Sequence, residues 1–129
     1  MFAVDATDPT PLYAQLERAI RVAIATGRLR PGERLPTVRQ LAVELRVNAN
    51  TVARVYGELE RAGVLGTCRG VGTFVRGLGN HTAALPQRRQ ALERLASRFL
   101  GDAAALGFRA DEAIELLRTA ATDEETFDA

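Results

Sequence analysis

The chain has 129 residues with a formal net charge of +1, and all 17 of its Lys+Arg cations are arginine. Hydrophobic residues make up 47% and charged residues 26%, which is typical of a soluble globular protein of one domain, or of one small domain with an appendage, and excludes a disordered chain. No apolar run approaches the roughly 20 residues that span a bilayer, and a single cysteine with a single histidine excludes a disulfide framework and argues against a zinc site.

Charge is distributed unevenly along the chain. Residues 1–80 contain 11 Arg and 7 Asp+Glu, a net +4, whereas residues 81–129 contain 6 Arg and 9 Asp+Glu, a net −3. The small total net charge therefore hides two different parts. The basic part, residues 1–80, suits a nucleic-acid partner, and the acidic part, residues 81–129, is considered separately. The N-terminus lacks the basic-then-apolar layout of a signal peptide, so a reducing, cytoplasmic setting is expected.

The first predicted helix covers about residues 11–26. Its apolar residues recur at helical spacing, Pro11 suits a first turn, and Gly27 suits a C-terminal stop. Pro31-Gly32 then predicts a turn before the next element.

Two short amphipathic helices follow. The second helix opens at Thr37, which forms a capping-box pattern with Gln40. The third starts after Asn48, a favourable N-cap, and ends at Gly63. Two such helices joined by a tight turn predict a helix-turn-helix.

The period then changes from helix to strand and back. Residues 64–68 and 73–76 read as two short strands around a glycine-rich turn, and residues 77–80 as a linker. Helical spacing returns from Pro86 to about Gly107. A shorter helix follows around residues 114–121, with an acidic tail from Asp123 that is expected to fray.

The third predicted helix carries an unusual exposed pattern. Opposite its apolar positions lie Asn50, Ala53, Arg54 and Gly57, which we call the recognition face. Its small residues let the backbone approach another surface, Arg54 suits a guanine edge or a phosphate, and Asn50 suits an adenine edge or a phosphate. A generic surface helix more often carries paired charges, so the pattern favours DNA contact over a merely solvated face.

Other polar residues extend this candidate surface. Asn48 and Thr51 lie beside the free N–H groups of a first helical turn, where a phosphate oxygen is favoured. Arg39 reaches a phosphate or a groove edge, or else is an exposed arginine in a salt bridge. Arg69 and Gly70 form the tip of the hairpin, which reads as a wing because it follows a helix-turn-helix and can enter a minor groove.

Three further residues are expected to have no role in binding DNA, a metal or another ligand. Arg34 is expected to be structural or merely exposed. Cys68 is expected to be a half-buried or exposed strand residue. A redox role would need nearby cations that lower the pKa of its thiol, and Arg69 is the only candidate, so no redox role is expected. His81 lies in the linker without a partner at ligand spacing and is expected to be exposed.

Three stretches carry a resemblance to a known family. They are LYAQLERAI (12–20), GRLRPGERLPTVRQLAVELRVNANTVARVYGELERAGVL (27–65) and RGVGTFV (69–75). Over about residues 9–77 the chain resembles the winged-helix DNA-binding domain of GntR-family bacterial transcription regulators. The family's G-x-L-x-P-G-x-x-L-P, V-R-x-L-A, N-T-V-x-R-x-Y-x-x-L-E and R-G-x-G-T-F-V follow in order at the right spacings.

The resemblance implies a mostly α fold with a small β-hairpin, in which a winged helix-turn-helix precedes a two-helix extension. Cys68 stands where the family often has a basic residue before the wing, which predicts a weaker grip on the DNA backbone. The DNA contacts that the resemblance implies are Thr37, Arg39, Asn48, Asn50, Thr51, Arg54, Arg69 and Gly70.

Residues 78–129 are too few for the large effector domain or the aminotransferase-like domain usual in the family. They resemble the small YtrA-type branch, in which two helices serve mainly for dimerisation. Two short helices cannot bury their own apolar residues, so a second copy is expected to cover them, the alternative being that they pack on the first helix of the same chain. The residues concerned are Leu92, Leu95, Phe99, Phe108, Ile114 and Leu117.

The expected function is a sequence-specific transcription regulator, a repressor rather than an activator, that binds a palindromic operator as a homodimer and needs no cofactor. A small-molecule sensor is a second hypothesis, although roughly 50 residues leave little room for the usual pocket of about 300 Å³ or more. No nucleophile–base pair, metal cluster or phosphate loop indicates an enzyme. A small-molecule effector is a further partner that the sequence neither identifies nor excludes.

Overall fold

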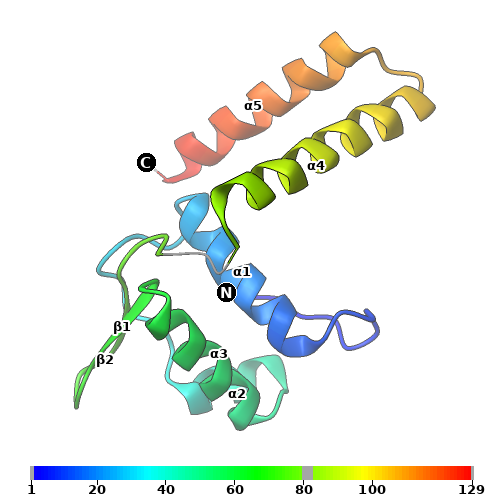
Figure 1. The fold of residues 1–129 in the computed structure, drawn as a ribbon. Helices are drawn as coiled ribbons and strands as arrows, with labels where there is room; N and C mark the ends of the chain where they lie inside the picture. Colours follow the sequence, from blue (N-terminus) through cyan, green and yellow to red (C-terminus); the bar gives the residue numbers. More distant parts are fainter. Residues whose placement is uncertain (1, 80–82, 129) are drawn as a thin grey trace. The chain divides into compact units, whose positions relative to one another are not determined.

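The structure, a computed structural model, describes residues 2–79 and 83–128, with side chains to residue 122 (Figure 1). The chain forms two compact units, residues 1–80 and 81–129. His81, interpreted above as an exposed linker residue, lies outside the described residues. The two units have opposite net charges, +4 for residues 1–80 and −3 for residues 81–129.

The first unit is built on α1 (Leu12–Ala25), which packs against α3 (Ala49–Arg61). The bounds of α1 confirm the predicted helix, and its apolar positions are buried because they recur on one side. The core of this unit draws residues from every element and comprises Phe2, Leu16, Ile20, Ala23, Ile24, Leu29, Leu35, Leu41, Ala42, Val52, Val55, Tyr56, Leu59, Val64, Leu65 and Val75.

The predicted helix-turn-helix is confirmed as α2 (Val38–Leu45) followed by α3. Both halves of the capping box form, since the Gln40 backbone N–H donates to Thr37 Oγ1 at 3.1 Å and the Thr37 N–H donates to Gln40 Oε1 at 2.9 Å. The tight turn is made by Arg46, which adopts a left-handed conformation with φ 57°. Asn48 caps α3, as its Oδ1 accepts the Asn50 N–H at 2.8 Å.

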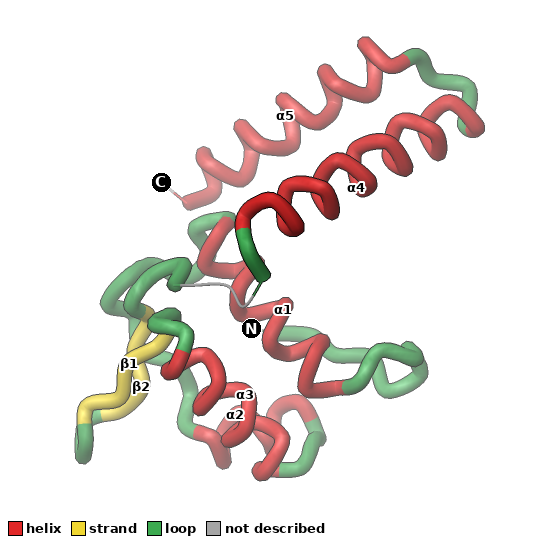
Figure 2. Tube along the Cα trace, in the orientation of Figure 1, coloured by secondary structure: helices red, strands yellow, loops and turns green. Residues whose placement is uncertain are grey.

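The strands β1 (Leu65–Cys68) and β2 (Gly72–Val75) form the predicted antiparallel hairpin (Figure 2). A third short segment lies beside β2, because Arg34 bridges to Phe74 and the Leu35 N–H donates to the Thr73 carbonyl at 2.8 Å. The sequence did not predict this segment. It ties the loop after α1 to the base of the wing.

The second unit is a helical hairpin of α4 (Leu85–Ala105) and α5 (Ala110–Asp128), which run antiparallel (Figures 1 and 2). The predicted end of α4 near Gly107 is confirmed. The predicted shorter helix is confirmed as α5, with 19 residues against 21 in α4, but it continues to Asp128 through the acidic tail that was expected to fray. Residues 123–128 include Glu124 and Glu125, which favour a helix, and neither glycine nor proline, which would end it.

Candidate nucleic-acid interface

The recognition face is exposed along one side of α3. Asn50, Ala53 and Arg54 are exposed and Gly57 is half-buried. The opposite side is buried, with Val52, Val55 and Leu59 each 0% exposed. The predicted division of α3 into a core side and a free side is therefore confirmed, and the face has small residues around one long cation.

Arg54 is held at its place on this face by two partners. Its guanidinium lies 4.0 Å from the centre of the Tyr13 ring, and its Nε donates to Glu58 Oε1 at 3.3 Å. The Arg54 side chain remains 55% exposed. The four-residue spacing to Glu58 is a signal that the sequence offered. No sequence signal linked Arg54 to Tyr13, which lies 41 positions earlier.

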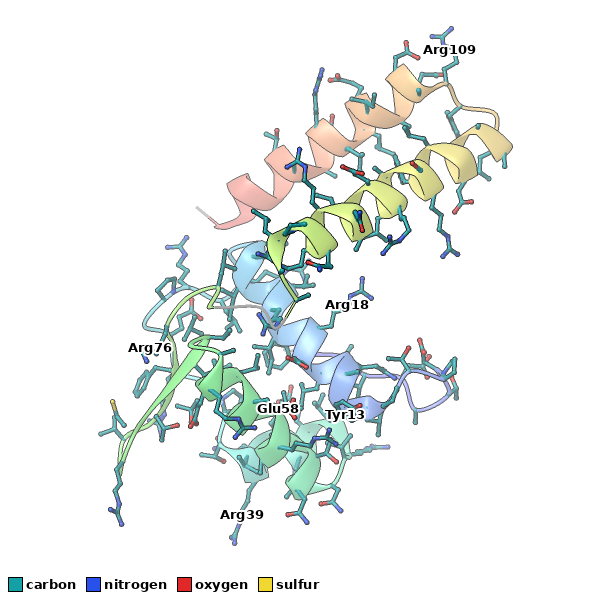
Figure 3. All side chains as sticks on the ribbon, viewed as in Figure 1. Tyr13, Arg18, Arg39, Glu58, Arg76 and Arg109 are labelled. Carbon is teal, nitrogen blue, oxygen red and sulfur yellow. The ribbon has the colours of Figure 1, made fainter. Side chains whose placement is uncertain are left out.

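The start of α2 presents Thr37 and Arg39 to solvent. The side chain of Arg39 extends away from the rest of its unit (Figure 3). Arg39 is therefore placed where it could reach a ligand, and its contact with DNA stays a prediction. Thr37 Oγ1 accepts the Gln40 N–H, which leaves its hydroxyl hydrogen to donate outward.

The start of α3 carries Asn48, Asn50 and Thr51. Asn48 and Asn50 are exposed and Thr51 is half-buried. Because the Asn48 oxygen is used by the cap, only its amide NH₂ is left to donate to another group. These donors surround a helix N-terminus, where the backbone dipole favours negative charge.

The wing ends in Arg69 and Gly70, both exposed. Gly70 has φ 80°, a backbone conformation that residues other than glycine rarely adopt. A Cβ at this position would meet nothing within 4 Å. The tip therefore offers bare backbone beside one arginine. Cys68 is a free, exposed thiol at the end of β1, as expected.

Two arginines brace the wing. A Cβ on Gly72 would lie 2.7 Å from Arg34 Nε, and a Cβ on Gly66 would lie 2.8 Å from Arg76 Cδ. Both side chains therefore cross the hairpin where glycine leaves room. Arg34 is exposed but contacts the hairpin, so of its two interpretations the structural one applies and the merely exposed one does not. Arg76, which Figure 3 labels, was not singled out in the sequence.

Further contacts fix the elements that carry the candidate residues. The Thr67 hydroxyl hydrogen-bonds the Glu60 carboxylate, which joins β1 to α3. The Tyr56 hydroxyl donates to the Pro36 carbonyl at 2.7 Å, which joins α3 to the start of α2. Burial, with a smaller contribution from the Glu44 carboxylate, raises the pKa of Tyr56 to about 12, so the hydroxyl keeps its proton for this bond.

The second unit exposes most of its apolar residues. Phe99 is half-buried, and the other five residues of the predicted dimerisation set are exposed, with Leu95 at 65%. The expectation of little room for a pocket is wrong, because a cleft of about 510 Å³ lies between α4 and α5. Its lining is mostly apolar and comprises Phe99, Asp102, Ala103, Leu106, Phe108, Glu112, Ala113 and Leu116.

No three His, Cys, Asp or Glu residues in the described part of the chain are grouped so that they could hold a metal ion. Across residues 2–79 and 83–128, no helix has both the length and the apolar character needed to cross a membrane.

Residues 12–75 match the family described as bacterial regulatory proteins, gntR family. The HTH-type transcriptional regulator Rv1152 of Mycobacterium tuberculosis is 40% identical over 114 residues, which cover 88% of this chain and 88% of that protein. The HTH-type transcriptional repressor YtrA of Bacillus subtilis is 40% identical over 75 residues, which cover 58% of each chain.

Among solved structures, the AraR(DBD) bound to operator ORX1 is similar with a TM-score of 0.52 and 29% identity, covering 58% of this chain and 95% of that one. The likeness to an operator-bound domain thus extends over about the length of the first unit.

Proposed function

The chain belongs to the GntR family of bacterial regulatory proteins, and from that premise we propose that it is a repressor of the small YtrA-type branch that binds a palindromic operator as a homodimer. In this proposal residues 9–77 form the DNA-binding domain, residues 78–129 form the dimerisation region, and the protein acts in the cytoplasm. Binding at a promoter would block RNA polymerase.

The recognition face of α3 is the observation that carries the proposal. It combines one exposed arginine with small neighbours on a helix whose opposite side is buried. Such a helix fits the major groove, where Arg54 can donate two hydrogen bonds to guanine and Asn50 can contact an adenine edge or a phosphate. The similarity to an operator-bound domain supports the same assignment.

The surrounding residues are proposed to position the protein on the backbone. Thr37, Asn48 and Thr51 supply short donors, and the α3 N-terminus favours a phosphate. Arg39 contacts a phosphate or a groove edge. Arg69, beside the bare backbone of the wing tip, lies against the sugar-phosphate ridge or enters the minor groove.

The dimer is supported by the second unit. Its apolar residues are exposed in a single copy, and the two helices differ in charge: α4 has four arginines and two carboxylates, whereas α5 has one arginine and seven carboxylates. A second copy would cover the apolar surface and set opposite charges against each other. We favour this occupant of the cleft between α4 and α5 over a small-molecule effector because two residues of the predicted dimerisation set, Phe99 and Phe108, line it.

Selection from a pool of random-sequence DNA duplexes tests the proposed function. The full-length protein is expected to enrich sequences that contain an inverted repeat. Recovery of a pool no richer in any sequence than the starting DNA would contradict sequence-specific binding.

If Arg69 lies against the sugar-phosphate ridge, Arg69→Gln is expected to weaken binding to the selected operator and to unrelated DNA by the same factor, since a backbone contact carries no sequence information. Unequal factors would instead place Arg69 in the minor groove. The slope of log affinity against log salt should fall in magnitude by about 1 for each arginine removed from the backbone. Fluorescence anisotropy titrations over a range of salt concentrations measure both quantities. Arg118→Gln on α5 removes the same charge outside the DNA-binding unit, and an equal change of slope in both variants would exclude a contact at Arg69.

A further inference from the structure

The Tyr13 ring forms a platform beneath the recognition face. Tyr13 is the second residue of α1, and its half-buried ring packs against the core of the first unit. The Arg54 guanidinium stands over this ring at 4.0 Å from its centre. Because the ring packs against the core, its position depends on how α1 packs on α3.

Glu58 restricts the rotation of the Arg54 guanidinium. It lies one turn after Arg54 on α3, and the hydrogen bond from Arg54 uses Nε and leaves both terminal nitrogens without a described acceptor. The ring restricts the plane of the guanidinium and the carboxylate restricts its rotation. We call Tyr13, Arg54 and Glu58 the arginine clamp. Its outward donor edge is Nη1 and Nη2, the pair that a bidentate contact with a base edge requires.

A clamped arginine differs from a free one in two ways. A free arginine loses much rotamer freedom when it binds, whereas the clamp has already removed part of that freedom. The Glu58 carboxylate also repels phosphates, which opposes a contact of Arg54 with the DNA backbone. Both effects favour a base contact in one direction over alternative contacts.

We propose that Tyr13 is a positioning residue that sets sequence discrimination by holding Arg54, with Glu58, in the orientation that reads a base. This inference rests on the proposed function, since it assumes that Arg54 meets DNA. It concerns the ratio of operator affinity to affinity for unrelated DNA, and not affinity in general. Tyr13 acts through Arg54 and needs no contact with DNA for this role.

Tyr13→Leu and Tyr13→Phe test the inference as a pair. Leucine keeps an apolar side chain against the core and removes the ring, whereas phenylalanine keeps the ring. Tyr13→Leu is expected to lower the affinity ratio by about fivefold, with binding to unrelated DNA unchanged, and Tyr13→Phe is expected to keep the wild-type ratio. In an Arg54→Ala background, Tyr13→Leu should cause no further loss of the ratio.

Glu58→Gln provides a variant that leaves the Tyr13 packing intact. It is expected to raise binding to unrelated DNA more than binding to the operator, so the ratio again falls. Thermal unfolding of each variant identifies loss of folded protein, which would reduce both affinities together. Anisotropy titrations with operator and unrelated duplexes give the ratios.

The inference is overturned if Tyr13→Leu leaves the ratio unchanged, if it lowers both affinities equally, or if its effect persists in the Arg54→Ala background. It is also overturned if Arg54→Ala leaves operator binding unchanged. A different result would count against the proposed function itself, namely that the wild type does not distinguish the operator from unrelated DNA. The two failures are therefore separable in one set of titrations.

Discussion

Leu95→Glu is expected to convert the protein from a dimer to a monomer and to weaken operator binding by at least about 100-fold. Leu95 lies midway along α4 and is 65% exposed in a single copy, so its side chain makes few contacts within its own unit. In a dimer the new carboxylate would be buried among apolar residues without a partner, which opposes association. A monomer reaches only one half-site at a time and loses the gain from binding two linked sites.

Analytical ultracentrifugation measures the mass, and anisotropy titrations measure the affinity. Ser97→Glu is the matched control, because it places the same carboxylate two residues away on the polar side of α4. It should remain dimeric and bind normally. A dimeric Leu95→Glu variant would show that the interface lies elsewhere. A monomeric wild type whose melting temperature falls with Leu95→Glu would favour the alternative, in which these helices pack on α1 of their own chain.

Arg54→Ala is expected to weaken operator binding by about 1–3 kcal/mol, roughly 10- to 150-fold, and to relax discrimination at one base position in each half-site. The loss follows from removal of two donors from the middle of the recognition face. Titrations with the operator and with duplexes that carry one changed base pair per half-site measure it. At the position read by Arg54, the variant should bind all four base pairs with similar affinity.

Arg118→Ala is the control for Arg54→Ala, because it removes the same charge from α5, outside the recognition face. It should retain the base preference of the wild type. Equal affinity of Arg54→Ala and wild type for the operator would remove Arg54 from the interface. Equal losses in the two arginine variants would assign the effect to charge alone and not to base recognition.

Local signals predicted the elements that carry the interface. Thr37 with Gln40, and Asn48, mark helix starts by side chains that bond backbone within three residues, so the sequence alone contains the interaction. The spacing of Val52 and Val55 likewise assigned the buried side of α3, and with it the exposed one.

Contacts between distant segments could not be predicted in this way. The bridge from Arg34 to Phe74 belongs to a segment too short to show a strand period, and the pairing of Tyr13 with Arg54 depends on how α1 packs on α3. The interface as a surface was therefore accessible from the sequence, whereas the contacts that orient its central arginine were not.

Hydroxyl-radical footprinting of the full-length protein on a selected operator tests the central proposal most directly. A homodimer with one recognition helix per copy predicts two protected half-sites related by two-fold symmetry, with centres about 34–36 Å apart, or a multiple of this helical turn. A single unsymmetrical footprint, or protection that does not depend on the inverted repeat, would contradict the account.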